Sequence, residues 1–213
     1  MTRLIVIRHG FSLSNAERRY TGQRDVSLSP KGYEQSERVA DYLCANERIH
    51  AIYASDLCRA TDTVAPTAAR LGLTVIGEPG LRETEVGEWT GRTYEEVQEN
   101  WGTLLAQHRT DPDIPCPGGE CHRQVFARVR DTLHRLAERH PDQTIVLATH
   151  AMPARCIEAI SAGHGIEQIS LHRVAPNASI RIYTYEDGRL VSQGRNIVSH
   201  LEKPGETLPD ELV

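Results

Sequence analysis

The sequence predicts an α/β fold, a three-layer α/β/α sandwich with a mostly parallel central sheet. Two observations lead to this prediction. Short apolar runs rich in β-branched residues alternate along the chain with amphipathic helical patterns. The runs at Leu4–Ile7 and Ile145–Leu147 are apolar almost throughout, which is typical of strands buried on both faces between two layers of helices.

Five apolar runs are expected to form the strands of this sheet. In chain order they are Leu4–Ile7, Ile49–Tyr53, Leu73–Ile76, Ile145–Ala148 and Ile180–Tyr185. Helical patterns fill most of the intervals between them. Because parallel strands need long crossover connections, this order of elements agrees with the predicted fold.

The first two helices have recognisable ends. The first begins after Ser29 and Pro30, which supply an N-cap and a proline in the first turn. The second runs from Leu57 to Leu71 and stops at Gly72, a residue suited to the left-handed conformation that often ends a helix. The first helix therefore has a clear start signal and the second a clear stop signal.

Two further helices and two irregular segments complete the pattern. The third helix begins at Thr93, where Glu96 completes a capping box. The fourth places apolar side chains on one face, at Phe126, Val129, Leu133 and Leu136. Irregular sequence is concentrated at Phe11–Ser29 and Asp111–Gly119, and long loops in a compact domain are usually functional.

Length and charge limit the classes of protein to consider. A chain of 213 residues is long enough for one substantial core and short for two typical domains. We therefore expect a single domain over residues 1–202, followed by an acidic tail at 203–213. The net charge of −5 and the lack of a long basic run exclude nucleic acid as an expected partner. No run approaches the ~20 apolar residues of a membrane span, and no signal peptide precedes the first strand, so no membrane partner is expected.

The cysteines indicate a reducing compartment. They are five in number and form no Cys-x-x-Cys pair, which predicts reduced thiols in a cytoplasmic protein. Cys116, Cys121 and His122 could suggest a metal site, but their spacing lacks the second ligand pair of a zinc site. We therefore expect neither a metal nor another cofactor.

Arginine and histidine side chains follow three of the predicted strands. Arg8 and His9 follow the first strand, Arg59 lies one helical turn beyond the second, and His150 follows the fourth. Ligands bind beyond the carboxyl ends of parallel strands, so we expect these four groups to converge. Their mutual repulsion would be compensated by a bound anion, and a phosphate suits the fork of an arginine.

The residues alone leave the attacking group open. A single histidine at a strand end is more often a structural residue, and only the cluster of four groups favours an anion site. An imidazole can attack phosphorus when one ring nitrogen is unprotonated and the other is held by a hydrogen bond. Gly10 would let backbone approach such a ring closely. Either His9 or His150 could meet these conditions.

Several short motifs occur in a fixed order along the chain. They are Arg8-His9-Gly10, Asn15, Thr21-Gly22, Leu28 to Gly32, Ala54 to Thr63, Leu81-Arg82-Glu83, Gly87 to Gly91, Pro117 to Glu120 and Thr149-His150. Together they identify a resemblance to the histidine phosphatase superfamily, also called the phosphoglycerate mutase-like family, over nearly the whole chain. The Pro-Gly-Gly-Glu stretch at Pro117–Glu120 is similar to a loop of the phosphatase branch.

The resemblance implies a role for each candidate residue. His9 would be the nucleophile that becomes phosphohistidine, and Glu83 would be the general acid that protonates the leaving alkoxide. Seven further residues would bind the phosphoryl group or the substrate: Arg8, Arg59, His150, Asn15, Thr21, Gly22 and Ala151. For Asn15 a purely local turn bond is the alternative.

The resemblance also implies a reaction. We expect a phosphomonoesterase that acts on a small phosphorylated metabolite, with a cofactor-dependent phosphoglycerate mutase-type transferase as the alternative. A catalytically inactive phosphate-binding or scaffold protein is disfavoured because nucleophile, clamp and acid candidates are all present. Three residues depart from the family pattern at positions that bear on specificity, namely Phe11, Cys121 and Met152. A homodimer is weakly expected.

Overall fold

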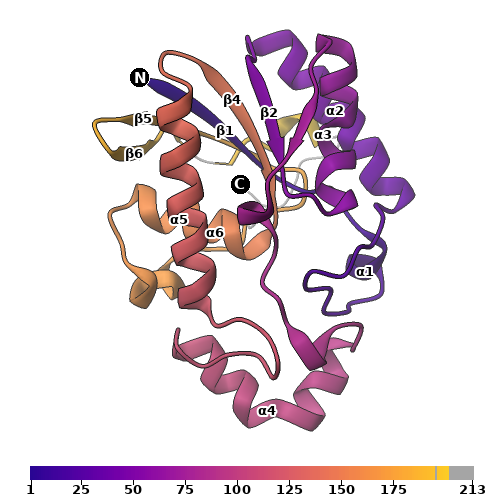
Figure 1. Ribbon diagram of the computed structural model, residues 1–213. Coiled ribbons are helices and arrows are strands. Elements are labelled where there is room, and N and C mark those ends of the chain that lie inside the picture. The colour runs from indigo at the N-terminus through magenta and orange to yellow at the C-terminus, as the bar shows by residue number, and fades with distance from the viewer. Residues whose placement is uncertain (195, 202–213) are drawn as a thin grey trace.

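The computed structural model describes residues 1–194 and 196–201, so the predicted tail at 203–213 lies outside the described residues. Its sheet has six strands in the order β3-β2-β4-β1-β5-β6 (Figure 1). The strands are β1 (Thr2–Arg8), β2 (Ala51–Ala54), β3 (Val75–Gly77), β4 (Thr144–Thr149), β5 (Ile180–Glu186) and β6 (Arg189–Ser192). β1 to β4 pair in parallel, whereas β5 and β6 are antiparallel to their neighbours, which confirms a mostly parallel sheet.

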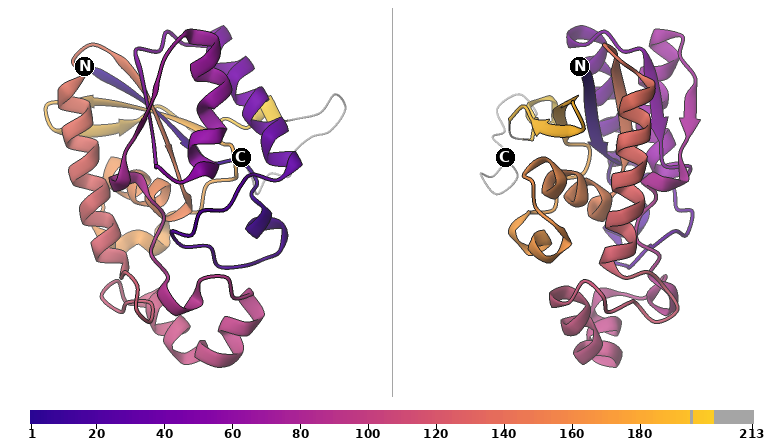
Figure 2. Two further views of the ribbon diagram at one scale, coloured as in Figure 1. Left: turned by 45° about the vertical axis from the view of Figure 1, so that its right-hand side comes forward. Right: turned by 60° about the vertical axis from the view of Figure 1, so that its left-hand side comes forward.

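Helices cover both faces of this sheet (Figure 2). The helices are α1 (Leu13–Ala16), α2 (Pro30–Asn46), α3 (Cys58–Leu71), α4 (Tyr94–Thr110), α5 (His122–Arg139) and α6 (Ala151–Ser161), with short 3₁₀ segments η1 (Pro79–Leu81), η2 (Gly87–Trp89), η3 (Ile166–Leu171) and η4 (Ser199–Leu201). Leu4 and Val6 of β1 pack into the core shared with α5 and α6. Ile5 and Ile7 pack into the core shared with α2 and α3, so the three-layer prediction is confirmed.

The helix ends follow the sequence signals. Ser29 caps α2 by accepting a hydrogen bond from the Gly32 N–H, and Gly72 ends α3 with φ at +64°. The capping box predicted for Thr93 and Glu96 is present at the start of α4. The sequence did not predict the short helix α1, which lies inside the first irregular segment, or strand β6.

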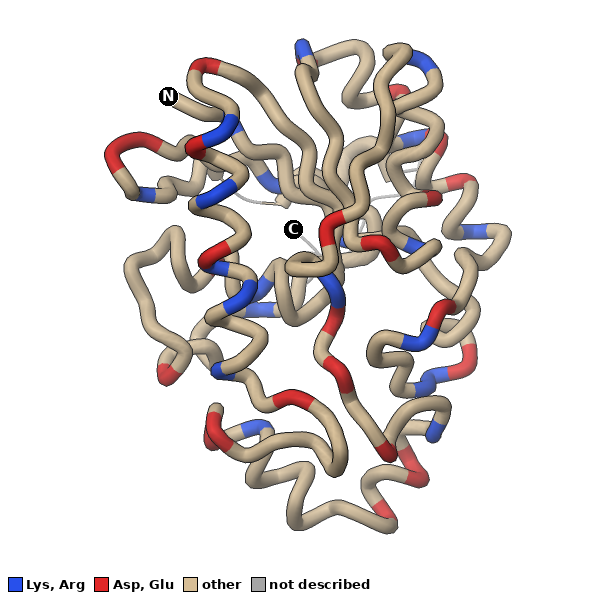
Figure 3. Tube along the Cα trace, viewed as in Figure 1, with Lys and Arg blue, Asp and Glu red and all other residues tan. Residues whose placement is uncertain are grey.

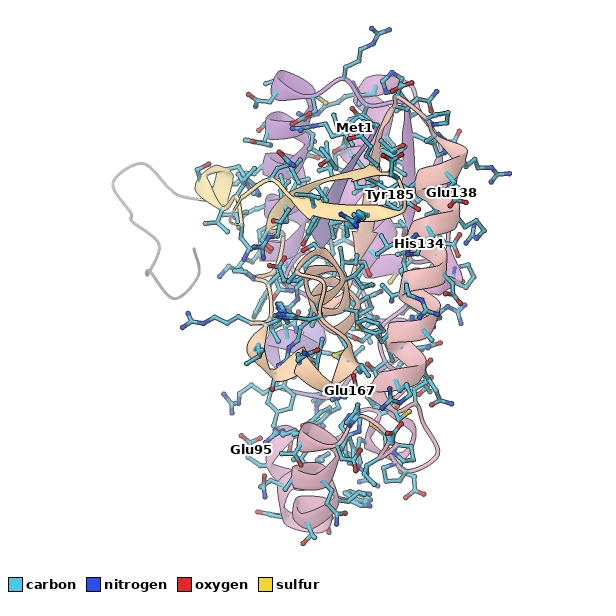
Figure 4. The ribbon with its side chains drawn as sticks, turned by 90° about the vertical axis from the view of Figure 1, so that its left-hand side faces the viewer. Met1, Glu95, His134, Glu138, Glu167 and Tyr185 are labelled. Carbon is cyan, nitrogen blue, oxygen red and sulfur yellow. The ribbon has the colours of Figure 1, made fainter. Side chains whose placement is uncertain are left out.

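Helix α4 lies apart from the sheet, at the bottom of the view in Figure 1. A separate core joins it to the preceding and following loops, and consists of Val86, Trp89, Val97, Leu105 and Cys116. Figure 4 shows the same separation, with Glu95 of α4 far from Tyr185 of β5, which bonds to His134 of α5. The chain therefore has a sheet-based body and a smaller cap built around α4.

Residues of both charge signs are scattered along the described chain, as Figure 3 shows. Of the helices in the described ranges, none has the length and hydropathy needed to cross a membrane. All five cysteines are free thiols.

Candidate active site

A pocket of about 970 Å³ lies at the carboxyl ends of the parallel strands and extends to the cap. It brings together eight of the nine predicted site residues as lining groups: Arg8, His9, Asn15, Thr21, Gly22, Arg59, Glu83 and Ala151. The ninth, His150, is fully buried directly behind the pocket, and its ring centroid is 5.0 Å from that of His9. The fold thus gathers groups from β1, α1, α3, α6 and four loops.

His9 has a fixed ring orientation. Its Nδ1 lies 2.7 Å from the carbonyl oxygen of Gly10, and because a carbonyl can only accept, Nδ1 carries the hydrogen. The lone pair is therefore on Nε2. The backbone N–H of His9 also donates to the Thr149 carbonyl oxygen at 2.8 Å, which ties β1 to the end of β4. Burial, and then the charges of Arg8 and Arg59, hold the pKa of His9 well below its usual value.

His150 stands in a different hydrogen-bonding environment. It precedes α6, is fully buried, and neither ring nitrogen has a hydrogen-bond partner in the part of the chain described. Burial, followed by the charges of Arg59, His9 and Arg8, holds the pKa of His150 well below its usual value. Buried polar groups without a partner are costly, so this ring is set up to bind a group from outside the protein.

Arg59 is almost fully buried and holds one wall of the site. Its two terminal nitrogens donate to the carbonyl oxygens of Gly22 at 2.8 Å and of Arg24 at 2.9 Å. Gly22 adopts φ +55°, a left-handed conformation that favours glycine, and an added Cβ would lie 2.8 Å from the side chain of Val86. The Thr21-Gly22 turn is therefore positioned by Arg59.

Arg8 completes the cationic cluster. One terminal nitrogen donates to the Ala175 carbonyl oxygen at 2.5 Å, while the buried Nε has no partner within the described ranges. Burial lowers the pKa of both Arg8 and Arg59, and Glu83 is the carboxylate that most offsets this effect. Two guanidinium groups that face a pocket with this little compensation favour an anionic ligand.

Glu83 sits at the N-terminus of α6. Its Oε2 accepts the N–H of Ala151 at 3.0 Å, and its Oε1 accepts the N–H groups of Met152 at 3.3 Å and Thr84 at 2.9 Å. Helix N-termini attract negative charge because their first N–H groups lack partners within the helix. The Ala151 N–H that was expected to bind phosphate thus donates to Glu83 here.

Two expectations about loop residues receive a structural explanation. Asn15 accepts from the backbone N–H of Ser12 at 3.0 Å in the capping box of α1, so the local bond is present in a residue that also lines the pocket. An added Cβ at Gly10 would lie 2.9 Å from the Gly32 carbonyl oxygen. Gly10 is therefore needed for contact with the first turn of α2, and its carbonyl oxygen also approaches the His9 imidazole, as expected.

Sequence reasoning missed several residues of the site. Asn177 donates to the His9 carbonyl oxygen at 3.0 Å and to Asn15 Oδ1 at 3.2 Å, and no motif marks it. The cap contributes Tyr20 and His108, which pack against Trp89 of the Gly87 to Gly91 motif and line the pocket with it. Within the described ranges no group of three potential ligands could hold a metal, and neither Cys121 nor Phe11 lines the pocket.

This fold and this cluster define a class of enzyme. The chain belongs to the histidine phosphatase superfamily (branch 1), whose family model matches residues 4–198. It is 34% identical to phosphoglycerate mutase-like protein 4 of Arabidopsis thaliana over 95% of this chain and 88% of that protein. It is 32% identical to phosphoserine phosphatase 1 of Hydrogenobacter thermophilus, over 94% and 95% of the two chains.

Solved structures and other relatives give the same classification. A mycobacterial glucosyl-3-phosphoglycerate phosphatase in complex with VO3 superposes with a TM-score of 0.83 at 29% identity, covering 90% of this chain and 96% of that one. A bifunctional protein of Mycobacterium tuberculosis is 34% identical, but the chain spans only 54% of its length. Relatives that are phosphatases support a phosphatase of this superfamily.

Proposed function

We propose that this protein hydrolyses phosphate monoesters of small metabolites through a phosphohistidine on Nε2 of His9. The observation that carries the proposal is the hydrogen bond from His9 Nδ1 to the Gly10 carbonyl oxygen, because it leaves the lone pair on Nε2. The lowered pKa of His9 keeps this lone pair available near neutral pH. His150 has no such bond, so the geometry favours His9 as the nucleophile.

The proposed reaction has two displacement steps at phosphorus. In the first, Nε2 of His9 attacks, the bond to the ester oxygen breaks, and a protonated Glu83 gives its proton to the departing oxygen. In the second, Glu83 takes a proton from water, the water oxygen attacks phosphorus, and the bond to Nε2 breaks to release inorganic phosphate. His9 and Glu83 return to their starting states, so atoms and protons balance.

The remaining site residues would hold the phosphoryl group. Arg8 and Arg59 supply charge-assisted donors, and His150 supplies a ring nitrogen without a partner of its own. Thr21, Gly22 and Asn15 line the same pocket. We expect phosphoryl oxygens to compete with Glu83 for the Ala151 N–H, which would free the Glu83 carboxyl to face the leaving group.

The size of the pocket leaves room for an organic group besides the phosphate. Two donors on its walls have N–H groups without an acceptor among the described residues: Trp89, through its buried Nε1, and Arg155 of α6. Arg155 donates its Nε to the His172 carbonyl oxygen at 2.6 Å and forms no ion pair with any described residue. We therefore expect the alcohol part of the substrate to carry acceptor groups, including an anion such as a carboxylate.

The test is hydrolysis of p-nitrophenyl phosphate in the presence of a metal chelator. Wild-type protein should release nitrophenol, and the rapidly quenched enzyme should carry an acid-labile phosphoryl group. His9→Ala should abolish both signals, whereas His134→Ala, a matched histidine on α5 outside the pocket, should retain them. Turnover that persists in His9→Ala would contradict the proposal.

The mutase alternative is tested with 3-phosphoglycerate. Incubation is followed by NMR for 2-phosphoglycerate and by a phosphate assay. We expect phosphate release without isomer. Isomer formation that outpaces phosphate release would replace hydrolysis by phosphoryl transfer as the proposed activity.

A further inference from the structure

The segment that carries Glu83 is held from behind by an arginine. Arg128 of α5 donates to three backbone carbonyl oxygens of this segment. They belong to Gly80 at 3.1 Å, Arg82 at 2.6 Å and Glu83 at 2.9 Å. A guanidinium has five N–H donors. The other two bind Glu120, so every donor of Arg128 has a partner.

Glu120 links this arginine to the far side of the same segment. Its Oε1 and Oε2 each accept from Arg128 at 2.9 Å. Oε2 also accepts the backbone N–H of Glu85 at 2.9 Å, and the N–H of Glu120 donates to the Glu85 carbonyl oxygen at 2.7 Å. Residues 80–85 are thus fixed on both sides of Glu83.

The Pro-Gly-Gly-Glu loop adds close backbone packing to these bonds. An added Cβ at Gly119 would lie 2.2 Å from the Glu85 carbonyl oxygen, and one at Gly87 would lie 2.0 Å from the Pro117 carbonyl oxygen. This contact brings Glu120 close enough to reach both Glu85 and Arg128. The loop therefore serves the placement of Glu120.

Neither Arg128 nor Glu120 is among the residues that line the pocket. Their side chains are each 21% exposed, and the charge of one is neutralised by the other. Because they do not face the substrate, any effect on catalysis must pass through the segment that they hold. That segment carries Glu83, whose carboxyl group lies at the N-terminus of α6.

We propose that Arg128, paired with Glu120, is a positioning residue that sets the place of the Glu83 carboxyl relative to the leaving-group oxygen. This inference rests on the proposed function, in which Glu83 is the general acid. Proton transfer requires hydrogen-bond distance, so a small displacement of residues 80–85 is expected to weaken it selectively.

The experiment compares esters with good and poor leaving groups. Dinitrophenolate departs without a proton, whereas an alkoxide needs one, so only alkyl esters depend on the acid. kcat/KM, which reports the step that breaks the ester bond, is measured for dinitrophenyl, phenyl and glycerol phosphates. Glu83→Gln should lose ~10²- to 10⁴-fold on glycerol phosphate and far less on the dinitrophenyl ester.

Arg128→Met and Glu120→Gln should show the same leaving-group dependence in a weaker form, with a loss on glycerol phosphate at least ~10-fold greater than on the dinitrophenyl ester. Arg128→Lys should recover part of it. Arg3→Met is the matched control, since Arg3 forms a similar two-point pair with Glu47 at 3.1 and 2.9 Å at the opposite end of β1. Arg3→Met should alter the Tm, and any change in kcat/KM should be the same for all three esters.

Two outcomes would overturn the inference, and they are distinguishable. If Glu83→Gln lowers kcat/KM equally for all esters, the general-acid assignment fails and the positioning role fails with it. The second outcome is that Glu83→Gln lowers kcat/KM selectively for the alkyl ester while folded Arg128→Met and Glu120→Gln lower kcat/KM equally for all esters. In that case only the positioning role fails.

Discussion

The imidazole rings of His9 and His150 lie 5.0 Å apart and are inclined by 57°, yet only the His9 ring has a hydrogen-bond partner among the described residues. Both rings are buried beside Arg8 and Arg59, which disfavours a second, charge-bearing proton on either ring. The pair therefore combines one oriented imidazole with one unengaged imidazole, and the lowered pKa of each favours its neutral form.

This pair should make stability depend on pH. An unfolded histidine has a pKa of about 6.5, and the folded values of His9 and His150 are lower, so below pH 6.5 the unfolded state binds more protons. As the pH is lowered below about 6.5, the free energy of unfolding should decrease by up to about 1.4 kcal/mol per pH unit for each ring. Urea unfolding at pH 7 and pH 5 should show a smaller loss for His150→Gln than for wild type. The exposed His50→Gln serves as control, and an equal loss in all three proteins would contradict the prediction.

Replacing Arg59 should impair catalysis even when its charge is retained. Arg59→Met should lower kcat/KM for p-nitrophenyl phosphate by roughly 10²- to 10³-fold, as for loss of one oxyanion donor. Arg59→Lys should recover little, because an ammonium lacks the fork that reaches both Gly22 and Arg24. Arg70→Met, which removes exposed pairs to Glu37 and Asp41, should leave activity unchanged. Activity near wild type in Arg59→Lys would show that charge alone suffices.

Replacing each of the two adjacent glycines of the Pro-Gly-Gly-Glu loop by alanine should cost different amounts of stability. Gly118 has φ +70° but open space around it, so Gly118→Ala should cost only the left-handed backbone penalty, about 1 to 2 kcal/mol. Gly119→Ala would drive Cβ into the Glu85 carbonyl oxygen and should cost clearly more. Denaturant unfolding of both variants gives the comparison. Equal stabilities would mean that the loop can move away from residues 85–87.

Arg155 should distinguish substrates by charge. Phosphoserine and phosphoethanolamine differ by one carboxylate, and Arg155→Met should raise KM for phosphoserine by about tenfold or more, the value of a charge-assisted hydrogen bond. KM for phosphoethanolamine should change little. Arg173→Met removes a neighbouring exposed arginine that does not line the pocket and should leave both values unchanged. A parallel change in both substrates would remove Arg155 from anion recognition.

Local sequence signals sufficed for the body of the fold. The apolar runs became β1 to β5, Ser29 and Thr93 began their helices where expected, and Gly72 ended its helix. β6 escaped prediction because it is a short edge strand with only one buried residue, Leu190. α1 escaped because four residues give too little periodicity to recognise.

The site residues also fall into those that local sequence signals predict and those that only tertiary packing places. His9 directly follows β1 and Arg59 lies in the first turn of the helix after β2, so strand position alone placed both at one edge of the sheet. Asn177 and Arg155 reach the pocket through tertiary packing, which no local pattern reports. The bond between Ala151 and Glu83 likewise joins residues 68 positions apart. Only the folded chain shows that the expected phosphate donor has a protein acceptor.

The separate core of Val86, Trp89, Val97, Leu105 and Cys116 has a consequence for how such an enzyme changes over evolution. Because these side chains pack with one another and not into the two cores of the sheet, substitutions there can reshape the wall that meets the organic part of a substrate. The reacting groups at the strand ends would keep their support. Substrate range and chemical competence are therefore separately adjustable, and directed evolution aimed at the cap offers a route to new specificities.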